Sequence, residues 1–249
     1  SGGPAADIRI GYAGGTSSLE VDASARVISR GDLTLGHSAY TPDPGVAYVS
    51  LFNGGSITVD RTLLLDTTST LEIDGGTVVA GALTSVAGSS PVIDLANPTG
   101  GIALTVGSAN IDSTFSGDIS DNGTPGTLKK VGSGTLTLSG SNNYTGGTII
   151  AGGTLRDGVD NALPTGQAVQ ITGGTLDLNG HNQTIGMLSG DSGGNIDLGS
   201  DTLIVGADNG DSTYAGSIKD GSVAGGKMIK IGTGTLTLSG TSDYTGGTR

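Results

Sequence analysis

The chain of 249 residues contains no cysteine and no tryptophan, and aromatic residues make up only 3% of it. Without cysteine it cannot form disulfides, which fits either a reducing compartment or an exported protein that avoids crosslinks during translocation. No apolar run reaches the length of about eighteen residues that a membrane-spanning helix needs. No signal peptide is visible, and the opening Ser-Gly-Gly suggests that a leader has been removed.

Basic residues are few as well. The chain has 11 Lys and Arg against 23 Asp and Glu, which gives a formal net charge of −12. The cations are scattered along the sequence, and few aromatic side chains are present to stack on bases. This composition argues against nucleic acid as a partner.

Helical periodicity is also missing, because one of the 48 glycines or a proline interrupts nearly every window. Short alternating segments are present instead. In "TLTLSG", which begins at Thr135, Leu136 and Leu138 share one face of a predicted strand, and Thr137 lies on the other. The same alternation occurs in "SITVD" at Ser56, "TLEID" at Thr70, "GTLDLNG" at Gly174 and "NIDLGS" at Asn195.

The first ninety residues contain three units that can be aligned by their strands. The units begin at Ile8, Leu33 and Leu63, and their second strands begin at Ser18, Tyr48 and Thr70. The longest unit contains "TPDPG" at 41–45, which is predicted to be a loop insertion.

A second repeat has a period of about one hundred residues. "KVGSGTLTLSGSNNYTGGT" at 130–148 returns as "KIGTGTLTLSGTSDYTGGT" at 230–248, and the segments 128–148 and 228–248 agree at 14 of 21 positions. We therefore predict two regions, 1–90 with short repeats and 91–249 with the long repeat. The boundary could also be a change of repeat type on one continuous scaffold.

Short strands without crossover helices predict an all-β fold, a right-handed parallel β-helix. Each strand would stack on its counterpart about 4.8 Å away in the next coil. At about 20–25 residues per coil, the chain would form roughly ten to twelve coils, and the long repeat would span four or five of them. An antiparallel β-sandwich is the alternative fold.

The repeated sequence resembles a known family. "LKKVGSGTLTLSGSNNYTGGT", "GGTLRDGVDNALPTG" and "GGTLDLNGHNQTIGMLSG" are similar to the autotransporter-associated β-strand repeat of type V secreted proteins in Gram-negative bacteria. The resemblance covers about residues 91–249, and residues 1–90 are more loosely similar to the short repeats of such passengers. It implies a β-helical passenger domain displayed outside the cell after passage through a C-terminal outer-membrane barrel. This sequence contains no such barrel, so we expect it to be a fragment of the full-length protein.

These observations predict a surface-displayed, non-enzymatic passenger fragment that serves as a stalk or adhesin scaffold, with C-terminal repeats that aid folding and export. The expected partners are a host receptor, a matrix protein, a glycan or a second cell carrying the same protein. Two alternatives stay open: a β-helical polysaccharide-degrading enzyme and a toxin-like passenger. No cofactor or metal is predicted.

Two short motifs could suggest specific chemistry. "GDSGG" at 190–194 matches the nucleophile segment of chymotrypsin-like proteases, which would need His37 or His181 as base. Asp191 and Ser192 instead fall at a predicted turn. The triplet Arg30, Gly31 and Asp32 could bind an integrin-type receptor if it lay on an exposed corner, although an Asp-rich and Gly-rich chain produces such triplets by chance.

Carboxylates and tyrosines form the remaining candidates. Two groups of Asp invite a calcium interpretation, but solvated turn carboxylates explain them as well; they are Asp191, Asp197 and Asp201, and Asp208 and Asp211. The Thr-x-Thr pair Thr135 and Thr137 is attributed to strand propensity, because an ice-binding face needs such pairs on many consecutive coils. Tyr144 and Tyr244 are predicted to be partly buried at a coil corner, with carbohydrate stacking as the functional interpretation.

Overall fold

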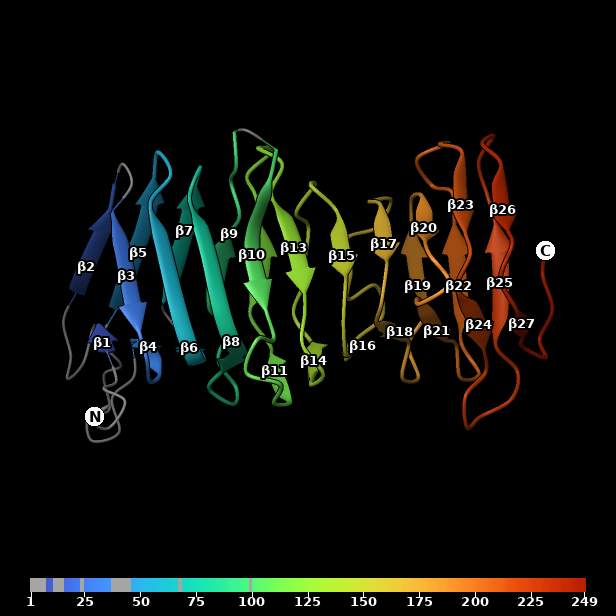
Figure 1. Ribbon diagram of the computed structural model, residues 1–249, viewed down its shortest axis with the longest axis horizontal. Coiled ribbons are helices and arrows are strands. Elements are labelled where there is room, and N and C mark those ends of the chain that lie inside the picture. The colour runs from blue at the N-terminus through green and yellow to red at the C-terminus, as the bar shows by residue number, and fades with distance from the viewer. Residues whose placement is uncertain (1–7, 11–15, 23–24, 37–45, 67–68, 99) are drawn as a thin grey trace.

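The fold is a parallel β-solenoid, seen here in a computed structural model (Figure 1). The structure describes residues 8–10, 16–22, 25–36, 46–66, 69–98 and 100–249. In these ranges every regular element is a strand, and the strands stack into about ten turns. The predicted parallel β-helix is therefore confirmed, and the sandwich alternative is wrong. No described segment forms a helix long and apolar enough to cross a membrane.

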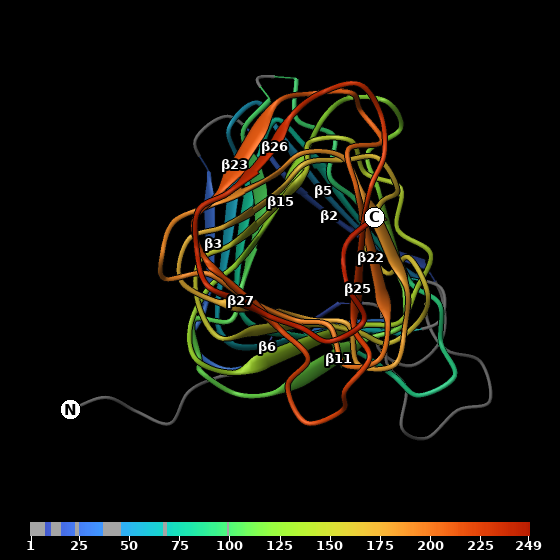
Figure 2. The ribbon, with the colours of Figure 1, turned by 90° about the vertical axis from the view of Figure 1, so that its right-hand side faces the viewer.

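Seen along its axis, the solenoid has a roughly triangular outline, so each coil contributes to three faces (Figure 2). Near the N-terminus, the first and second faces belong to the same twelve-stranded sheet. Two long strands there bend around the corner between the two faces: β6 (Ser56–Leu65) and β8 (Thr77–Ser85).

Each of the remaining strands belongs to a single face. The first face continues with β3 (Arg26–Ser29), β10 (Ile102–Val106), β13 (Thr127–Lys130), β15 (Thr148–Ile150), β17 (Val169–Ile171), β20 (Leu188–Gly190), β23 (Ser212–Tyr214) and β26 (Leu236–Leu238). The second face continues with β1 (Ile8–Ile10), β4 (Leu33–Leu35), β11 (Ser113–Phe115), β14 (Thr135–Leu138), β16 (Thr154–Asp157), β18 (Thr175–Asp177), β21 (Asn195–Asp197), β24 (Ser217–Lys219) and β27 (Ser242–Asp243).

The third face consists of a five-stranded and a three-stranded sheet. They contain β2 (Thr16–Val21), β5 (Val46–Phe52), β7 (Thr70–Asp74), β9 (Val92–Asp94) and β12 (Asp118–Ser120), and then β19 (Gln183–Ile185), β22 (Thr202–Val205) and β25 (Lys227–Lys230). Irregular coil segments join the two sheets through side-chain hydrogen bonds. The Asn142 amide accepts the Ile119 N–H at 2.9 Å and donates to the Ala162 carbonyl at 2.7 Å.

The N-terminal units align as their sequences predict. Ile8 pairs with Leu33 and Leu33 with Leu63, while Tyr48 pairs with both Ser18 and Thr70. Equivalent positions stack because side chains alternate between the two sides of a strand. A shift of the register by one residue would turn every inward side chain outward. The predicted insertion at 41–45 and His37 lie outside the described residues.

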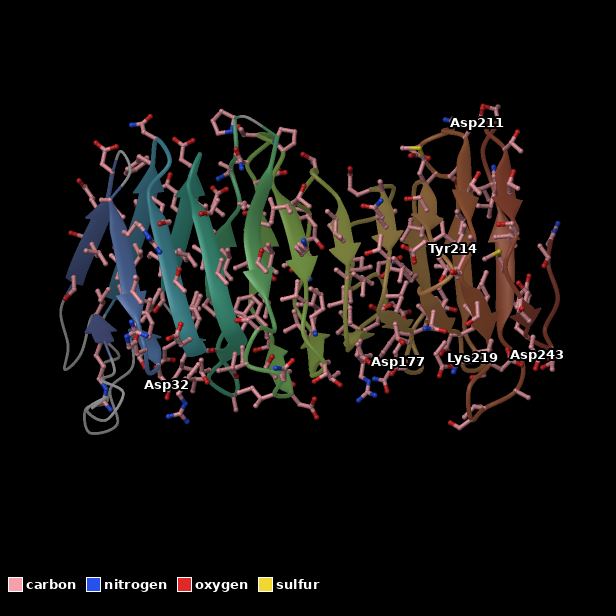
Figure 3. All side chains as sticks on the ribbon, in the orientation of Figure 1. Asp32, Asp177, Asp211, Tyr214, Lys219 and Asp243 are labelled. Atoms are coloured by element: carbon pink, nitrogen blue, oxygen red, sulfur yellow. The ribbon has the colours of Figure 1, made fainter. Side chains whose placement is uncertain are left out.

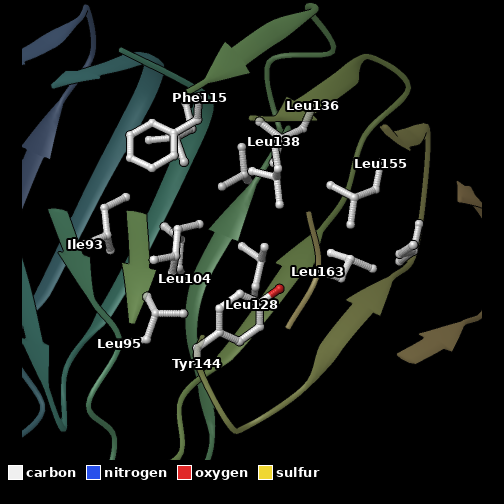
Figure 4. Packing of buried hydrophobic residues seen from close by; sticks show 14 of the residues in the cluster. Ile93, Leu95, Leu104, Phe115, Leu128, Leu136, Leu138, Tyr144, Leu155 and Leu163 are labelled. Carbon is white, nitrogen blue, oxygen red and sulfur yellow. The ribbon is translucent and has the colours of Figure 1, made fainter. Parts of the chain in front are cut away.

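The core is one column of mostly aliphatic side chains that runs along the solenoid. Figure 4 shows part of this column. Leu136 and Leu138 point inward and are buried, whereas Thr135 and Thr137 are half-buried on the outer surface. The predicted strand faces are therefore confirmed. Burial of each Leu contributes about 1.5–3 kcal/mol, so the narrow core gains stability by repetition along the axis.

Tight corners separate the faces, and glycine is required where neighbouring coils come close. Gly132 has a φ of +68°, and a β-carbon there would lie 1.9 Å from the Gly107 carbonyl oxygen of the preceding coil. Asn supplies a positive φ at six other turns, as expected for a residue that tolerates the left-handed region: Asn53, Asn110, Asn122, Asn161, Asn179 and Asn209.

The two copies of the long repeat lie on different faces. β13 lies on the first face and its counterpart β25 on the third; β14 lies on the second face and β26 on the first. Four turns separate β13 from β23, and β25 follows β23 two faces later. The repeat therefore advances by about four and two-thirds turns, so its strands keep their order but move by one face.

The sheets are continuous across the predicted boundary near residue 90. β8 pairs with β10, and β9 pairs with both β7 and β12. The division into 1–90 and 91–249 stays a proposal about repeat type, on one scaffold.

Candidate functional site

The repeated coil itself is the first candidate site, because the same hydrogen bonds recur in both copies. In the first copy, the Ser133 N–H donates to Asn110 Oδ1 at 2.8 Å and the Thr135 N–H to Asp112 Oδ1 at 2.7 Å. In the second copy, Asn209 and Asp211 accept from the backbone of Thr233 and Thr235 at 3.1 and 2.6 Å. A side chain of one coil thus satisfies backbone donors at the corner of the next.

A second pair of aspartates does the same at another corner. The Thr145 hydroxyl donates to Asp121 Oδ2 at 2.7 Å, and the Thr145 N–H donates to the same atom. Thr245 binds Asp220 in the same way, at 2.9 Å through its N–H and 2.7 Å through its hydroxyl. Charge-assisted bonds of this kind are stronger than neutral ones, so these aspartates fasten successive coils.

Lys130 is the only lysine among the described residues that the structure buries, at 1% exposure. Its ammonium donates to the carbonyls of Val131 and Gly152 at 2.6 and 3.3 Å, and the latter belongs to the next coil. Burial lowers the pKa of Lys130 to about 8, while nearby Asp112 acts in the opposite direction. Lys230 donates in the same way to the carbonyl of Ile231 at 2.5 Å. Sequence reasoning did not predict that Lys130 is buried.

Tyr144 and Tyr244 occupy the same place in the repeat, and Tyr244 lies on the last coil, at the open end of the solenoid. The Tyr144 ring is fully buried and its hydroxyl bonds to the Thr148 hydroxyl at 2.7 Å. Tyr244 makes the equivalent contact with Thr248 but is half-buried. Burial leaves the Tyr144 ring no face for a sugar, and stacking at Tyr244 stays a prediction.

Asp157 occupies a core position, which sequence reasoning missed. It pairs in register with Leu138, is 0% exposed, and neither carboxyl oxygen has a hydrogen-bond partner. Burial raises the pKa of Asp157 well above its usual value, and Asp177, Asp160 and Asp201 raise it further. The alternation of β16 carries the signal, because it places residue 157 on the inward face with Leu155.

The triplet Arg30, Gly31 and Asp32 lies between β3 and β4, at the predicted corner. Gly31 is buried and Arg30 is exposed. Asp32 Oδ1 accepts the Thr62 N–H of the next coil at 2.9 Å, so this carboxylate is part of the corner structure. Figure 3 places Asp32 at the edge of the molecule. Receptor binding by the triplet stays a prediction.

The protease-like segment forms the predicted turn. Asp191 Oδ1 accepts the Gly193 N–H at 3.0 Å, and the Gly194 N–H donates to the Asp191 carbonyl at 3.1 Å. His181 lies 3.4 Å from Asp160, on a different corner contact. Together these contacts give the segment a structural role.

The aspartates considered for calcium accept backbone donors. Asp201 binds the Gly180 N–H at 2.8 Å, Asp208 the Met187 N–H at 3.0 Å, and Asp197 the Gly199 N–H at 3.3 Å. Over the described ranges, no group of three or more His, Cys, Asp or Glu could hold a metal ion. Asp197 therefore caps its own turn, whereas Asp201 and Asp208 bind the backbone of the preceding coil.

Thr135, the first threonine of the Thr-x-Thr pair, has threonines at the equivalent position of the next coils. Thr135 pairs with Thr154, and Thr154 with Thr175, so three consecutive coils present threonine at one outward position. The spacing of the "TLT" copies in the sequence concealed this column, because "TLR" and "TLD" carry the same first threonine.

Comparison with known proteins relates the chain to autotransporters. The passenger-associated-transport-repeat family matches residues 128–156 and 228–249. The chain is 38% identical over 156 residues to the "Adhesin BmaC autotransporter" of Brucella suis biovar 1 (strain 1330), covering 60% of this chain and 4% of the relative. It is 31% identical over 103 residues to the "Uncharacterized lipoprotein YdeK" of Escherichia coli (strain K12), covering 41% and 7%.

The chain thus spans only a small part of the curated relatives it matches. No solved structure matches it significantly. Both matched segments lie on coils of the parallel solenoid and carry the recurring Lys, Tyr and Thr contacts described above. Residues 128–156 and 228–249 are therefore passenger-associated-transport repeats, and over 156 residues the chain is similar to an autotransporter adhesin.

Proposed function

We propose that this chain is a surface-displayed segment of an autotransporter passenger, where it serves as a non-enzymatic β-helical stalk or adhesin scaffold. The observation that carries the proposal is the recurrence of one set of inter-coil hydrogen bonds in both repeats. A rigid rod built by repetition holds binding surfaces at a distance from the cell. The name of the Brucella relative supports the adhesin part of the proposal.

The repeats also aid folding and export under this proposal. Each coil offers carboxylate acceptors to the backbone of its neighbour, so a formed coil is a template for the next one. A chain emerging at the cell surface would gain free energy with every coil added, which favours outward movement without another energy source. The coils that emerge first would then order those that follow.

Two alternatives are kept. A polysaccharide-degrading enzyme predicts a carboxylate-lined depression, and one is present beside Asp177, Asp197 and Asp201. A toxin-like passenger has no specific observation in its favour. The partner of an adhesin would be a host receptor, a matrix protein, a glycan or another cell.

The test is display of this segment ahead of an autotransporter barrel on a non-adherent bacterial host. We expect external protease to reach the segment, and we expect the displaying cells to bind host-cell monolayers or matrix-coated plates better than cells with the barrel alone. The double variant Asp121→Ala/Asp220→Ala should lower the displayed amount, while the exposed control Asp243→Ala should not. Equal display of all forms would remove the role of the repeats in export.

A further inference from the structure

The second face carries two columns of outward side chains over consecutive coils. One column is formed by hydroxyls and an amide, Thr135, Thr154, Thr175, Asn195 and Ser217. The other contains charges, in the order Thr137, Arg156, Asp177, Asp197 and Lys219. We call these ten residues the polar strip. Figure 3 shows Asp177 and Lys219 along the same edge of the molecule.

Two depressions lie along the polar strip and meet at Arg156. One, of about 430 Å³, is lined by hydroxyl residues that include Ser113, Thr114 and Thr137. The other, of about 370 Å³, lies between Asp177, Asp197 and the turn that carries Val223. Arg156 lines both, so the two depressions adjoin at this side chain, and we call them together the polar groove.

Arg156 and Asp177 form the centre of this groove. The Arg156 Nε lies 2.8 Å from Asp177 Oδ2, with the two side chains 42% and 19% exposed. The equivalent outward position one coil earlier is Thr137, which packs into the same fold without a charge. The ion pair is therefore dispensable for coil stacking, and its remaining hydrogen-bonding capacity is available to a ligand.

The lining favours a hydroxylated ligand over an anionic one. Hydroxyl groups of Thr and Ser both donate and accept, Arg156 donates, and the carboxylates accept, and a sugar hydroxyl can satisfy each of these. Five carboxylates of the lining oppose an anionic polymer: Asp112, Asp177, Asp197, Asp201 and Asp220. The one cation of the lining is Arg156, the side chain that the two depressions share. The coils repeat about every 4.8 Å, so the column of hydroxyl and amide side chains in the polar strip offers similar contacts at regular steps along an extended chain.

We propose that the polar strip binds a neutral polysaccharide chain laid along the solenoid axis, without cleaving it. This inference rests on the proposed adhesin function and names its ligand class. The absence of aromatic side chains from the lining of both depressions predicts weak contact per sugar, so binding depends on many coils acting together.

The experiment is affinity electrophoresis of the purified chain in native gels that contain galactomannan, mixed-linkage β-glucan, amylose or dextran. We expect at least one of these neutral polymers to retard the chain. Arg156→Ala and Asp177→Asn should each reduce the retardation at least tenfold in apparent affinity. Asn keeps an oxygen for the Asn179 N–H, so the turn after β18 is preserved.

The matched control is Asp60→Asn, which alters another exposed ion pair at the N-terminal end, where Asp60 lies 3.9 Å from Arg30. It should bind like the unaltered chain, and circular dichroism should show an unchanged strand content in all three variants. Lack of retardation by every neutral polymer, or equal retardation of the Arg156→Ala variant, would overturn the proposal.

Three further outcomes would also contradict it: retardation only by cationic chitosan with loss in salt, retardation only by polygalacturonate, or release of reducing ends from a bound polymer. The last result would favour the enzyme alternative. If glycan binding fails while cells that display the segment still adhere, the adhesin scaffold survives and only the ligand class is wrong.

Discussion

Thr137 and Thr237 occupy the same position in the two copies of the repeat, yet they lie on different faces of the solenoid. Thr137 pairs with Thr114 and Arg156 on the second face, and Thr237 pairs with Thr213 on the first. The coils between them differ in length, so one hundred residues do not make a whole number of turns. The two copies therefore present equivalent surfaces in different directions.

This displacement can be measured because the chain has no cysteine of its own. Spin labels at Thr137→Cys and Thr237→Cys should be farther apart than labels at Thr137→Cys and Asp243→Cys. Asp243 lies five coils from Thr137 on the same face, about 24 Å along the axis. The first pair is separated by about 22 Å axially and also across the solenoid. Pulsed electron paramagnetic resonance measures both distances, and equal distances would contradict the placement of Thr137 and Thr237 on different faces.

The inward and outward positions of β14 should differ in their tolerance of charge. Leu136→Asp removes a buried aliphatic side chain, which costs about 2–5 kcal/mol, and adds the penalty of burying a carboxylate. Thr137→Asp places the charge beside Arg156 on the outer surface and should stay within about 0.5 kcal/mol of the unaltered chain. Urea unfolding gives both values, and similar losses at the two positions would contradict the observed faces.

Asp157 should make stability depend on pH. Its pKa is raised by burial, so the folded state keeps the proton at pH values where the unfolded chain has lost it. The stability of the unaltered protein is then highest below the unfolded pKa and falls as pH rises toward the folded pKa. Asp157→Asn removes this dependence, so its urea midpoint should exceed that of the unaltered chain at pH 8 and approach it at pH 4.

A second variant separates charge from shape at this position. Asp157→Leu introduces the residue type that its partner Leu138 has one coil earlier, and it should stabilise the protein at pH 8 as well. A pH-independent difference for Asp157→Asn would show that the carboxyl is not held neutral.

Lys130 should have the opposite sign of pH dependence at alkaline pH. Burial lowers its pKa to about 8, below the ordinary value of 10.5, so the folded state releases a proton that the unfolded chain retains between these values. The unfolded state then binds more protons, and the contribution of Lys130 to stability rises with pH. The free energy by which Lys130→Met destabilises the protein should therefore grow between pH 7 and pH 10. Denaturant unfolding at both values checks this, and a constant or shrinking difference would rule it out.

The C-terminal coils should be the more stable part when separated. Residues 128–249 contain the recurring capping contacts of Asp211 and Asp220, and we expect this fragment to fold without 1–90. The fragment 1–90 should be weaker, because it has fewer near-identical units. Urea midpoints of the two fragments at equal concentration provide the comparison, and equal midpoints or a disordered C-terminal fragment would contradict it. Sedimentation must first show that neither fragment associates through its open strand edges.

Local pattern alone determined the strands and which of their side chains point into the core. Leu136 and Leu138 had to point inward together because side chains alternate along a strand, and the matched units at Leu33 and Leu63 had to stack because a one-residue slip would expose every core side chain. Gly and Asn marked the corners because these residues favour turns. The predicted turn at Asp191 and Ser192 followed from the same turn-forming residue types.

Only the tertiary structure decided which face each segment occupies and how deeply equivalent residues are buried. Face depends on the summed length of the preceding coils, so copies as similar as β14 and β26 separate although their sequences agree. Burial depends on the neighbouring coils, which cover Tyr144 completely. The contact between Arg156 and Asp177, 21 residues apart, likewise exists because successive coils stack in register. A local sequence specifies a strand, but the number of residues around each turn specifies which strands become neighbours.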